Sequence, residues 1–169
     1  MLIDLSDILM HEGKSAQPTA DIELDSFSVL GLEFKIIKKQ QLILTLKNIE
    51  KNLLTLETDI KLSLSIPCDR CVEEVIKNFE QKVNKNIDMK LLGTDELDFM
   101  EKNFLNVDKL VCSEIFPELP MKVLCKADCK GICPKCGCNL NVKECECEKT
   151  ELDPRMSRIL DIFNEYKEV

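Results

Sequence analysis

LTLETDIKLSLSI, from Leu54 to Ile66, is the stretch of sequence that decides the fold. Its even-numbered residues are apolar except for Thr58, and its odd-numbered residues are polar or charged. Alternation over this many positions predicts a β-strand with one face buried and the other in water. An antiparallel sheet that is covered on one face contains strands of this kind.

Weaker patterns on both sides of this stretch predict further strands. Apolar residues alternate from Leu30 to Ile36 and again from Leu42 to Leu46, and residues 48–52 supply a turn. Residues 75–91 are apolar at every fourth position and also at alternate positions, which fits a helix or a strand. We favour a strand, because a four-residue repeat drifts by about 40° per step around a helix of 3.6 residues per turn.

These patterns predict an α+β fold, in which an antiparallel sheet, curled toward a barrel, carries a short helix, a cysteine-rich zinc module and a C-terminal helix. We expect an N-terminal arm at residues 1–20, with a loop or flexible segment from His11 to Ala20, and the sheet domain at residues 21–120. Within that domain we expect an acidic loop at residues 92–106 and a short helix from Asp108 to Phe116. The cysteine-rich module covers residues 121–150. The C-terminal helix covers residues 151–169, with Asp153 as its N-cap and Pro154 in its first turn.

Composition limits the classes of function. The 169 residues carry a formal net charge of -8, which argues against tight, nonspecific binding to bare nucleic acid. No apolar run approaches the roughly 20 residues of a membrane span. The first residues are acidic where a secretory signal would be basic, so we expect a cytoplasmic protein with no membrane contact. Disulfides do not persist in that compartment, so the ten cysteines need another role.

The downstream cysteines predict a zinc site. Cys133 and Cys136 are separated by two residues and followed by Gly137, a spacing that lets both thiolates bind one ion in a tight turn. Cys145 and Cys147 supply the second pair. Four thiolates around one ion form a closed structural site with no open position for chemistry. Residues 121–150 have almost no apolar periodicity, so we expect them to need a metal in order to fold.

The upstream cysteines leave more than one possibility. Cys68 and Cys71 follow the best predicted strand, and with Cys125 and Cys129 they would complete a second zinc site. Such a site would join the sheet to the tail. An alternative is a thiol-disulfide enzyme or a zinc-thiolate redox sensor that uses Cys68 and Cys71. An iron–sulfur cluster and disulfides are further alternatives, although the spacings do not match ferredoxin motifs.

The remaining residues give little support to catalysis. We expect Cys112 to be a small core residue, whereas Cys138 could replace a neighbouring cysteine as a ligand. His11 is the only histidine, so no Cys-His or Ser-His pair is predicted. The five glycines form no phosphate-binding loop. We therefore predict a protein that is not an enzyme and has no small-molecule substrate.

Several motifs in order resemble the YceD family, the large ribosomal RNA subunit accumulation proteins. The resemblance begins with Cys68-x-Arg70-Cys71 after a long strand. It continues with ELPMxxLC at residues 118–125, DCKGICPxCG at residues 128–137, NLN at residues 139–141, Cys145-x-Cys147 and DPR at residues 153–155. The eight paired cysteines match the recurring cysteines of the family, and five other residues match its remaining motif positions. These five are Arg70, Gly131, Asn139, Asn141 and Arg155.

The resemblance implies a process rather than a reaction. It implies a role in accumulation of large-subunit ribosomal RNA, as an assembly factor for the large ribosomal subunit. The partner would then be a large-subunit precursor, contacted through ribosomal RNA or a ribosomal protein. Four lysines interleave with the cysteines of the tail, from Cys125 to Cys147, and could form a contact surface together with Arg70, or could offset the charge of the thiolates. The four lysines are Lys126, Lys130, Lys135 and Lys143.

Overall fold

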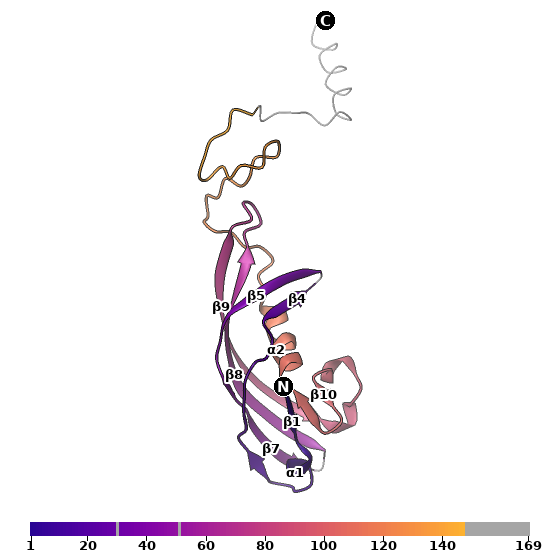
Figure 1. Cartoon of the computed structure of the whole chain (residues 1–169). Coiled ribbons are helices and arrows are strands. Elements are labelled where there is room, and N and C mark those ends of the chain that lie inside the picture. The colour runs from indigo at the N-terminus through magenta and orange to yellow at the C-terminus, as the bar shows by residue number, and fades with distance from the viewer. Residues whose placement is uncertain (30, 51, 148–169) are drawn as a thin grey trace, which may run out of the picture.

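A long antiparallel hairpin organises the fold (Figure 1). The structure is a computed structural model that describes residues 1–29, 31–50 and 52–147. The strands β8 (Leu53–Pro67) and β9 (Glu74–Asp88) pair without a break, from Leu53 opposite Asp88 to Pro67 opposite Glu74. The even-numbered residues of β8 from Leu54 to Ile66 are all buried, which confirms the predicted strand and its inner face.

The segment at residues 75–91, whose pattern fits either a helix or a strand, forms a strand over most of its length. In β9, Val83 and Ile87 are buried, and Val75 and Phe79 are half-buried on the same face. The strand ends at Asp88, and the 3-10 helix η1 (Met89–Leu91) follows it. The prediction of a strand is therefore confirmed for all but the last three residues of that segment.

The other strands of the main sheet line the second edge of β8. β5 (Leu32–Lys39) pairs with the upper half of β8, and β7 (Thr45–Glu50) pairs with its lower half. β4 (Ser26–Val29) extends the sheet beyond β5, and β2 (Ser15–Ala16) extends it beyond β7. β6 (Leu42–Ile43) turns away from β8 to pair with β3 (Thr19–Ala20). Among the described strands, this sheet does not close into a barrel.

Within the predicted arm at residues 1–20, the expected loop from His11 to Ala20 is wrong, because the arm contains β2 and β3 there. Besides β2 and β3, it contains β1 (Leu2–Asp4) and α1 (Ser6–Leu9). Ile3, Leu5 and Ile8 are buried in the main core. The buried side chain of Asn48 also donates to the carbonyl groups of Ile8, Leu9 and His11. Strands of two or three residues are too short to produce a periodic pattern in the sequence.

The acidic segment 92–106 also contains more structure than a loop. It holds the 3-10 helix η2 (Asp95–Leu97) and the strands β10 (Met100–Glu101) and β11 (Phe104–Asn106). β11 pairs with both β10 and β1, so the beginning of the chain completes a three-stranded sheet. Phe99 and Leu105 are buried, which explains why the segment stays on the core despite its charge.

The predicted short helix is α2 (Val107–Ile115), followed by the 3-10 helix η3 (Phe116–Glu118). Its N-cap is Asn106, whose side chain accepts from the backbone N–H of Lys109. The helix contacts β9 and β11, and Glu114 forms an ion pair with Lys85 of β9. Cys112 is half-buried against the core, as expected for a small core residue.

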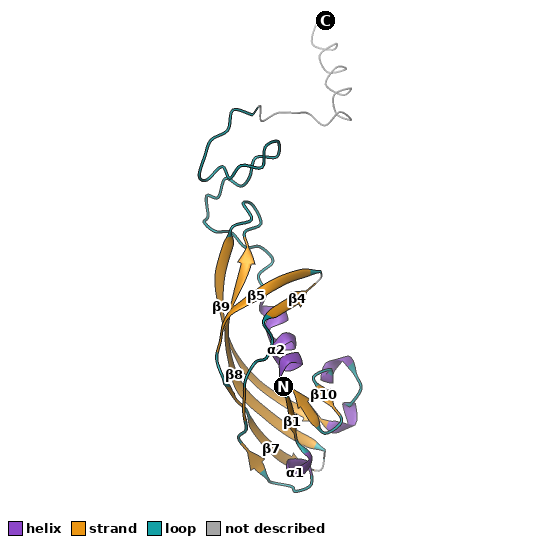
Figure 2. Cartoon of the chain, viewed as in Figure 1, coloured by secondary structure: helices purple, strands orange, loops and turns teal. Residues whose placement is uncertain are grey.

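Beyond Pro120 the chain reaches the end of the β8–β9 hairpin. Residues 121–147 are drawn almost entirely as loop at that end (Figures 1 and 2). Their only pairing within the described part of the chain is an isolated bridge between Ile132 and Asn139. The predicted C-terminal helix lies outside the described residues, and the predicted division into domains stays a prediction.

Candidate metal centres

The turn that joins β8 to β9 carries the upstream cysteine pair. The backbone N–H of Cys68 donates to the carbonyl of Glu73 at 2.8 Å, and that of Val72 donates to the carbonyl of Cys68 at 2.9 Å. These bonds fold residues 68–73 into a tight turn in which Cys68 and Cys71 are both buried. We call this turn, together with residues 121–147, the tip.

Asp69 holds the second part of the tip against this turn. Its backbone N–H donates to the carbonyl of Val123 at 2.9 Å, and its carboxylate accepts from the N–H of Val123 at 2.6 Å. This double contact brings Cys125 and Cys129 to the upstream pair. The structure therefore gathers the four cysteines that the sequence suggested for the joining site.

The geometry of this upstream group fits a tetrahedral ion. The four sulfur atoms lie within 4.8 Å of one another. Cys68 Sγ is 3.8 Å from Cys129 Sγ, and Cys71 Sγ is 3.5 Å from Cys125 Sγ. Four sulfurs at about 2.3 Å from a zinc ion would be about 3.8 Å apart. The upstream group could thus hold a metal ion with little movement of its side chains.

The downstream group is also a set of four mutually close sulfur atoms. The sulfur atoms of Cys133, Cys136, Cys145 and Cys147 also lie within 4.8 Å of one another. The N–H of Gly137 donates to the carbonyl of Cys133 at 2.8 Å, which repeats the bond from Val72 to Cys68. This group is more open than the upstream one, because Cys136 is exposed and Cys145 and Cys147 are only half-buried.

Both turns stabilise a thiolate at their first cysteine. Burial opposes ionisation of Cys68, but backbone N–H groups, led by that of Arg70, outweigh it and lower the pKa of Cys68 to about 6. In the downstream turn the N–H groups of Cys136 and Lys135 lower the pKa of Cys133 to about 6. Donors aimed at sulfur are expected where the thiolate is a metal ligand.

In each group, contact with neighbouring sulfurs also raises the pKa of another cysteine, so ionisation of one sulfur disfavours that of the next. The N–H of Glu73 favours the Cys71 thiolate, yet burial and the sulfurs of Cys125, Cys68 and Cys129 raise the pKa of Cys71 to about 12. Contact with Cys136 raises the pKa of Cys147 to about 12. A divalent ion between the four sulfurs would remove this repulsion.

Hydrogen bonds connect the two groups into one unit. The backbone N–H of Ile132 donates to the carbonyl of Arg70 at 3.0 Å, and the Arg70 side chain donates to the carbonyl of Cys129 at 2.8 Å. The side-chain amide of Asn141 donates to Cys129 Sγ at 3.3 Å, while its oxygen accepts from the N–H of Lys130 at 2.9 Å. We call residues 131–147 the downstream loop. A residue of this loop, Asn141, therefore contacts a ligand of the upstream group.

Reasoning from the sequence missed some of these contacts. Asp69 stands inside the Cys68–Cys71 spacing, and nothing in the pattern distinguishes it from a solvated carboxylate. Asn139 and Asn141 were noted only as motif positions, although short amide side chains in a loop commonly bond to nearby backbone. Cys138 lies beside the downstream group and contacts Cys136 and Cys145, but it is not one of the four mutually close sulfurs.

The proposed contact residues all lie on the surface of the tip. Lys126, Lys130, Lys135 and Lys143 are exposed, and so is Arg70. Lys130 lies 3.8 Å from the carboxylate of Glu144. Arg70 also stabilises the tip, because its guanidinium group donates to the backbone carbonyl of Cys129.

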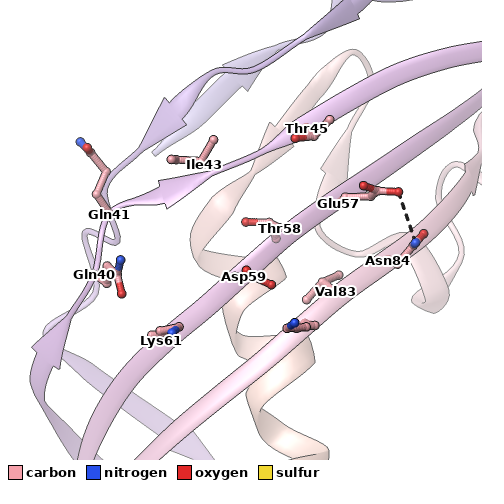
Figure 3. Close-up of a pocket in the computed structure, with 11 residues that line it drawn as sticks. Gln40, Gln41, Ile43, Thr45, Glu57, Thr58, Asp59, Lys61, Val83 and Asn84 are labelled. Atoms are coloured by element: carbon pink, nitrogen blue, oxygen red, sulfur yellow. Dashed lines mark hydrogen bonds between the residues drawn. The ribbon is translucent and has the colours of Figure 1, made fainter.

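A cavity of about 560 Å³ lies in the main sheet, away from the cysteines (Figure 3). It opens where β6 pairs with β3 instead of β8, so that Thr58–Lys61 of β8 pairs with no strand on that side. Its lining mixes acids, bases and amides, and Asn84 of β9 donates to Glu57, its partner on β8, at 3.3 Å. The hydroxyl of Thr58 is buried there without a hydrogen-bond partner among the described residues. These groups form no recognisable ligand set, so the cysteine groups are the stronger candidate site.

Fold and site together define a class of protein: an antiparallel sheet whose hairpin tip gathers two groups of four cysteines, each able to hold a metal ion. The chain belongs to the YceD family, because the family model described as "Large ribosomal RNA subunit accumulation protein YceD" matches residues 56–163. The match covers the β8–β9 hairpin from Leu56 onward and all eight clustered cysteines.

A curated relative in Arabidopsis thaliana is named "Large ribosomal RNA subunit accumulation protein YCED homolog 1, chloroplastic". It is 35% identical over 60 residues, which cover 35% of this chain and 19% of the relative. The chain thus aligns with about a fifth of that protein's length. No solved structure matches the chain significantly. In the described residues, no helix is long and apolar enough to cross a membrane.

Proposed function

We propose that this chain is a non-enzymatic, zinc-binding factor in ribosome biogenesis. It would promote accumulation of large-subunit ribosomal RNA by assisting assembly of the large ribosomal subunit. The observation that carries the proposal is the family match over residues 56–163, since both the family description and the name of the relative refer to this process.

The choice of zinc rests on the ligands. All eight candidate ligands are cysteines, and closed sets of four thiolates are typical of structural zinc sites. Sulfur–sulfur distances of 3.5 and 3.8 Å in the upstream group support this choice. The ligand residues would be Cys68, Cys71, Cys125 and Cys129 upstream, and Cys133, Cys136, Cys145 and Cys147 downstream.

A closed site supports a structural role rather than catalysis. Four protein ligands leave no coordination position for water or substrate. The alternative is a thiol-disulfide enzyme or redox sensor that uses Cys68 and Cys71. Their position in a hairpin turn, each with its short sulfur contact to the other pair, favours shared metal ligation instead. Alkylation separates the two ideas, because metal-bound cysteines should resist it until a chelator is added.

The tip is the proposed contact with the large-subunit precursor. It carries the exposed side chains of Lys126, Lys130, Lys135, Lys143 and Arg70. The lysines would either contact the precursor or offset the charge of the thiolates. Reversing the charge of the four lysines together separates these roles, because contact predicts loss of binding with unchanged zinc content.

Co-sedimentation with purified large-subunit precursors tests the proposed function. The wild-type chain should sediment with the precursors and not with mature small subunits, and its depletion should lower the ratio of large-subunit to small-subunit ribosomal RNA. An unchanged ratio, together with no co-sedimentation, would rule out the proposed function. If the lysine variant binds as tightly as wild type and with the same salt dependence, the lysines only compensate charge.

A further inference from the structure

Val72, directly after the second upstream cysteine, has an unusual backbone. Its φ is 63°, in the left-handed region that β-branched residues avoid. The equivalent position of the downstream turn holds Gly137, with φ 72°, which has no side chain to strain. The Val72 side chain is 64% exposed, so burial does not compensate for the strain. Backbone strain at a residue whose side chain faces solvent suggests that this side chain contacts another molecule.

Two further apolar side chains are exposed close to Val72. Ile132 is 42% exposed and Val142 is 80% exposed. Asn139 links the three: its amide donates to Glu73, the neighbour of Val72, at 2.8 Å, and its carbonyl accepts from the N–H of Val142 at 3.1 Å. Asn139 also forms the isolated bridge with Ile132. We call Val72, Ile132 and Val142 the tip apolar set.

The charge of the tip does not favour a phosphate backbone as its partner. The tip contains six basic and five acidic side chains, so they nearly cancel. An ion held by four thiolates adds negative charge at each group, because the thiolates outweigh a divalent cation. The whole chain carries a formal charge of -8. Binding to nucleic acid depends on an excess of cationic groups, whereas an acidic protein with exposed apolar side chains complements a basic protein surface.

We propose that the tip apolar set docks on a protein of the large-subunit precursor whose surface is basic and has an apolar centre. This inference rests on the proposed function, because it names the partner at the tip. The apolar side chains would be buried at the centre of the interface, where most binding energy is concentrated. The negative charge that metal-bound thiolates would give the tip would attract basic residues of the partner and speed its association.

Photo-crosslinking identifies the partner. A photoreactive amino acid replaces Val142 in the full-length, metal-loaded chain, which is then irradiated with purified large-subunit precursors. A chain with the same photoreactive amino acid at position 10 is the matched control, because Met10, the C-cap residue of α1, is 78% exposed. We expect adducts from position 142 that are digested by protease and resist ribonuclease, and none from position 10. Adducts that consist of RNA would overturn the inference.

Substitution then tests the energetic role of Val72. Val72→Gly removes the side chain and relieves the strain, so thermal stability and zinc content should be kept or improved. Binding to the precursor, and to the purified crosslinked protein, should weaken at least tenfold, and Val142→Ser should act in the same direction. Met10→Ser should bind as wild type does. If Val72→Gly and Val142→Ser both bind normally, the docking surface lies elsewhere, even though co-sedimentation of the wild-type chain still supports the proposed function. Failure of wild-type co-sedimentation would instead overturn both.

Discussion

A β-carbon added to Gly131 would lie 3.0 Å from the backbone carbonyl oxygen of Arg70. The downstream loop is therefore packed directly on the backbone of the upstream turn, without a side chain between them. Gly131 has φ 79°, so both its backbone conformation and its surroundings favour glycine. This contact is one reason why the two cysteine groups form a single tip.

Gly131→Ala should therefore loosen the tip. The left-handed conformation costs about 1–2 kcal/mol for a residue with a side chain, and the close contact with Arg70 adds to it. Gly137→Ala is the matched control, because Gly137 has φ 72° but no atom within 4 Å of the added carbon. Gly131→Ala should release metal to a chelator faster than Gly137→Ala, as measured by a zinc-sensitive dye. Equal rates would show that the contact with Arg70 has no energetic importance.

Asn141→Ala should weaken metal binding at the upstream group, which lies far away in sequence. Asn141 donates to Cys129 Sγ, and loss of a hydrogen bond to a metal ligand typically lowers metal affinity 10–100-fold. Lys143→Ala is a suitable control in the same loop, because Lys143 is exposed. Competition with a chelator of known affinity measures the effect. If Asn141→Ala lowers the metal affinity of the downstream group only, the inferred coupling between the two cysteine groups is wrong.

Cys133→Ser should disorder the downstream loop and leave the sheet folded. Residues 131–147 contain no helix or strand, so their order would depend on the metal. The core of β8, β9 and α2 contains no ligand of the downstream group. Hydrogen exchange should increase across residues 131–147 and stay slow in β8. Unchanged exchange in that loop would mean that another interaction holds it.

Leu56→Ala should destabilise the sheet without removing metal. Leu56 is fully buried in β8, and such a truncation usually costs about 2–5 kcal/mol. Asp59→Ala, on the exposed face of the same strand, should change the free energy of unfolding by less than about 0.5 kcal/mol. Urea unfolding followed by circular dichroism measures both. A small effect of Leu56→Ala would argue against the inner face assigned to β8.

Parts of the fold with a long repeating pattern could be predicted from the sequence. The alternation from Leu54 to Ile66 predicted β8, and the drift of the four-residue repeat around a helix favoured a strand for β9. The short strands near the beginning of the chain and at residues 100–106 could not be found, because each has two or three residues and all but β10 pair with a strand distant in sequence. Their order comes from tertiary pairing, which no local pattern records.

The cysteine spacings predicted the groups of the site but not the connections between them. Pairs such as Cys133 and Cys136 indicate a chelating turn, and elimination suggested that Cys125 and Cys129 join Cys68 and Cys71. The structure brings these two sets of four together. The hydrogen bond from Asn141 to Cys129 and the strain at Val72 depend on backbone geometry. Such features become visible only when the chain is folded.

Metal analysis of the purified chain tests the central claim most directly. Elemental analysis combined with X-ray absorption at the zinc edge gives the number of ions and their ligands. The two cysteine groups predict two zinc ions per chain, each surrounded by four sulfurs at about 2.3 Å. A chain that contains no zinc, that contains iron, or whose zinc has oxygen or nitrogen ligands would contradict the claim.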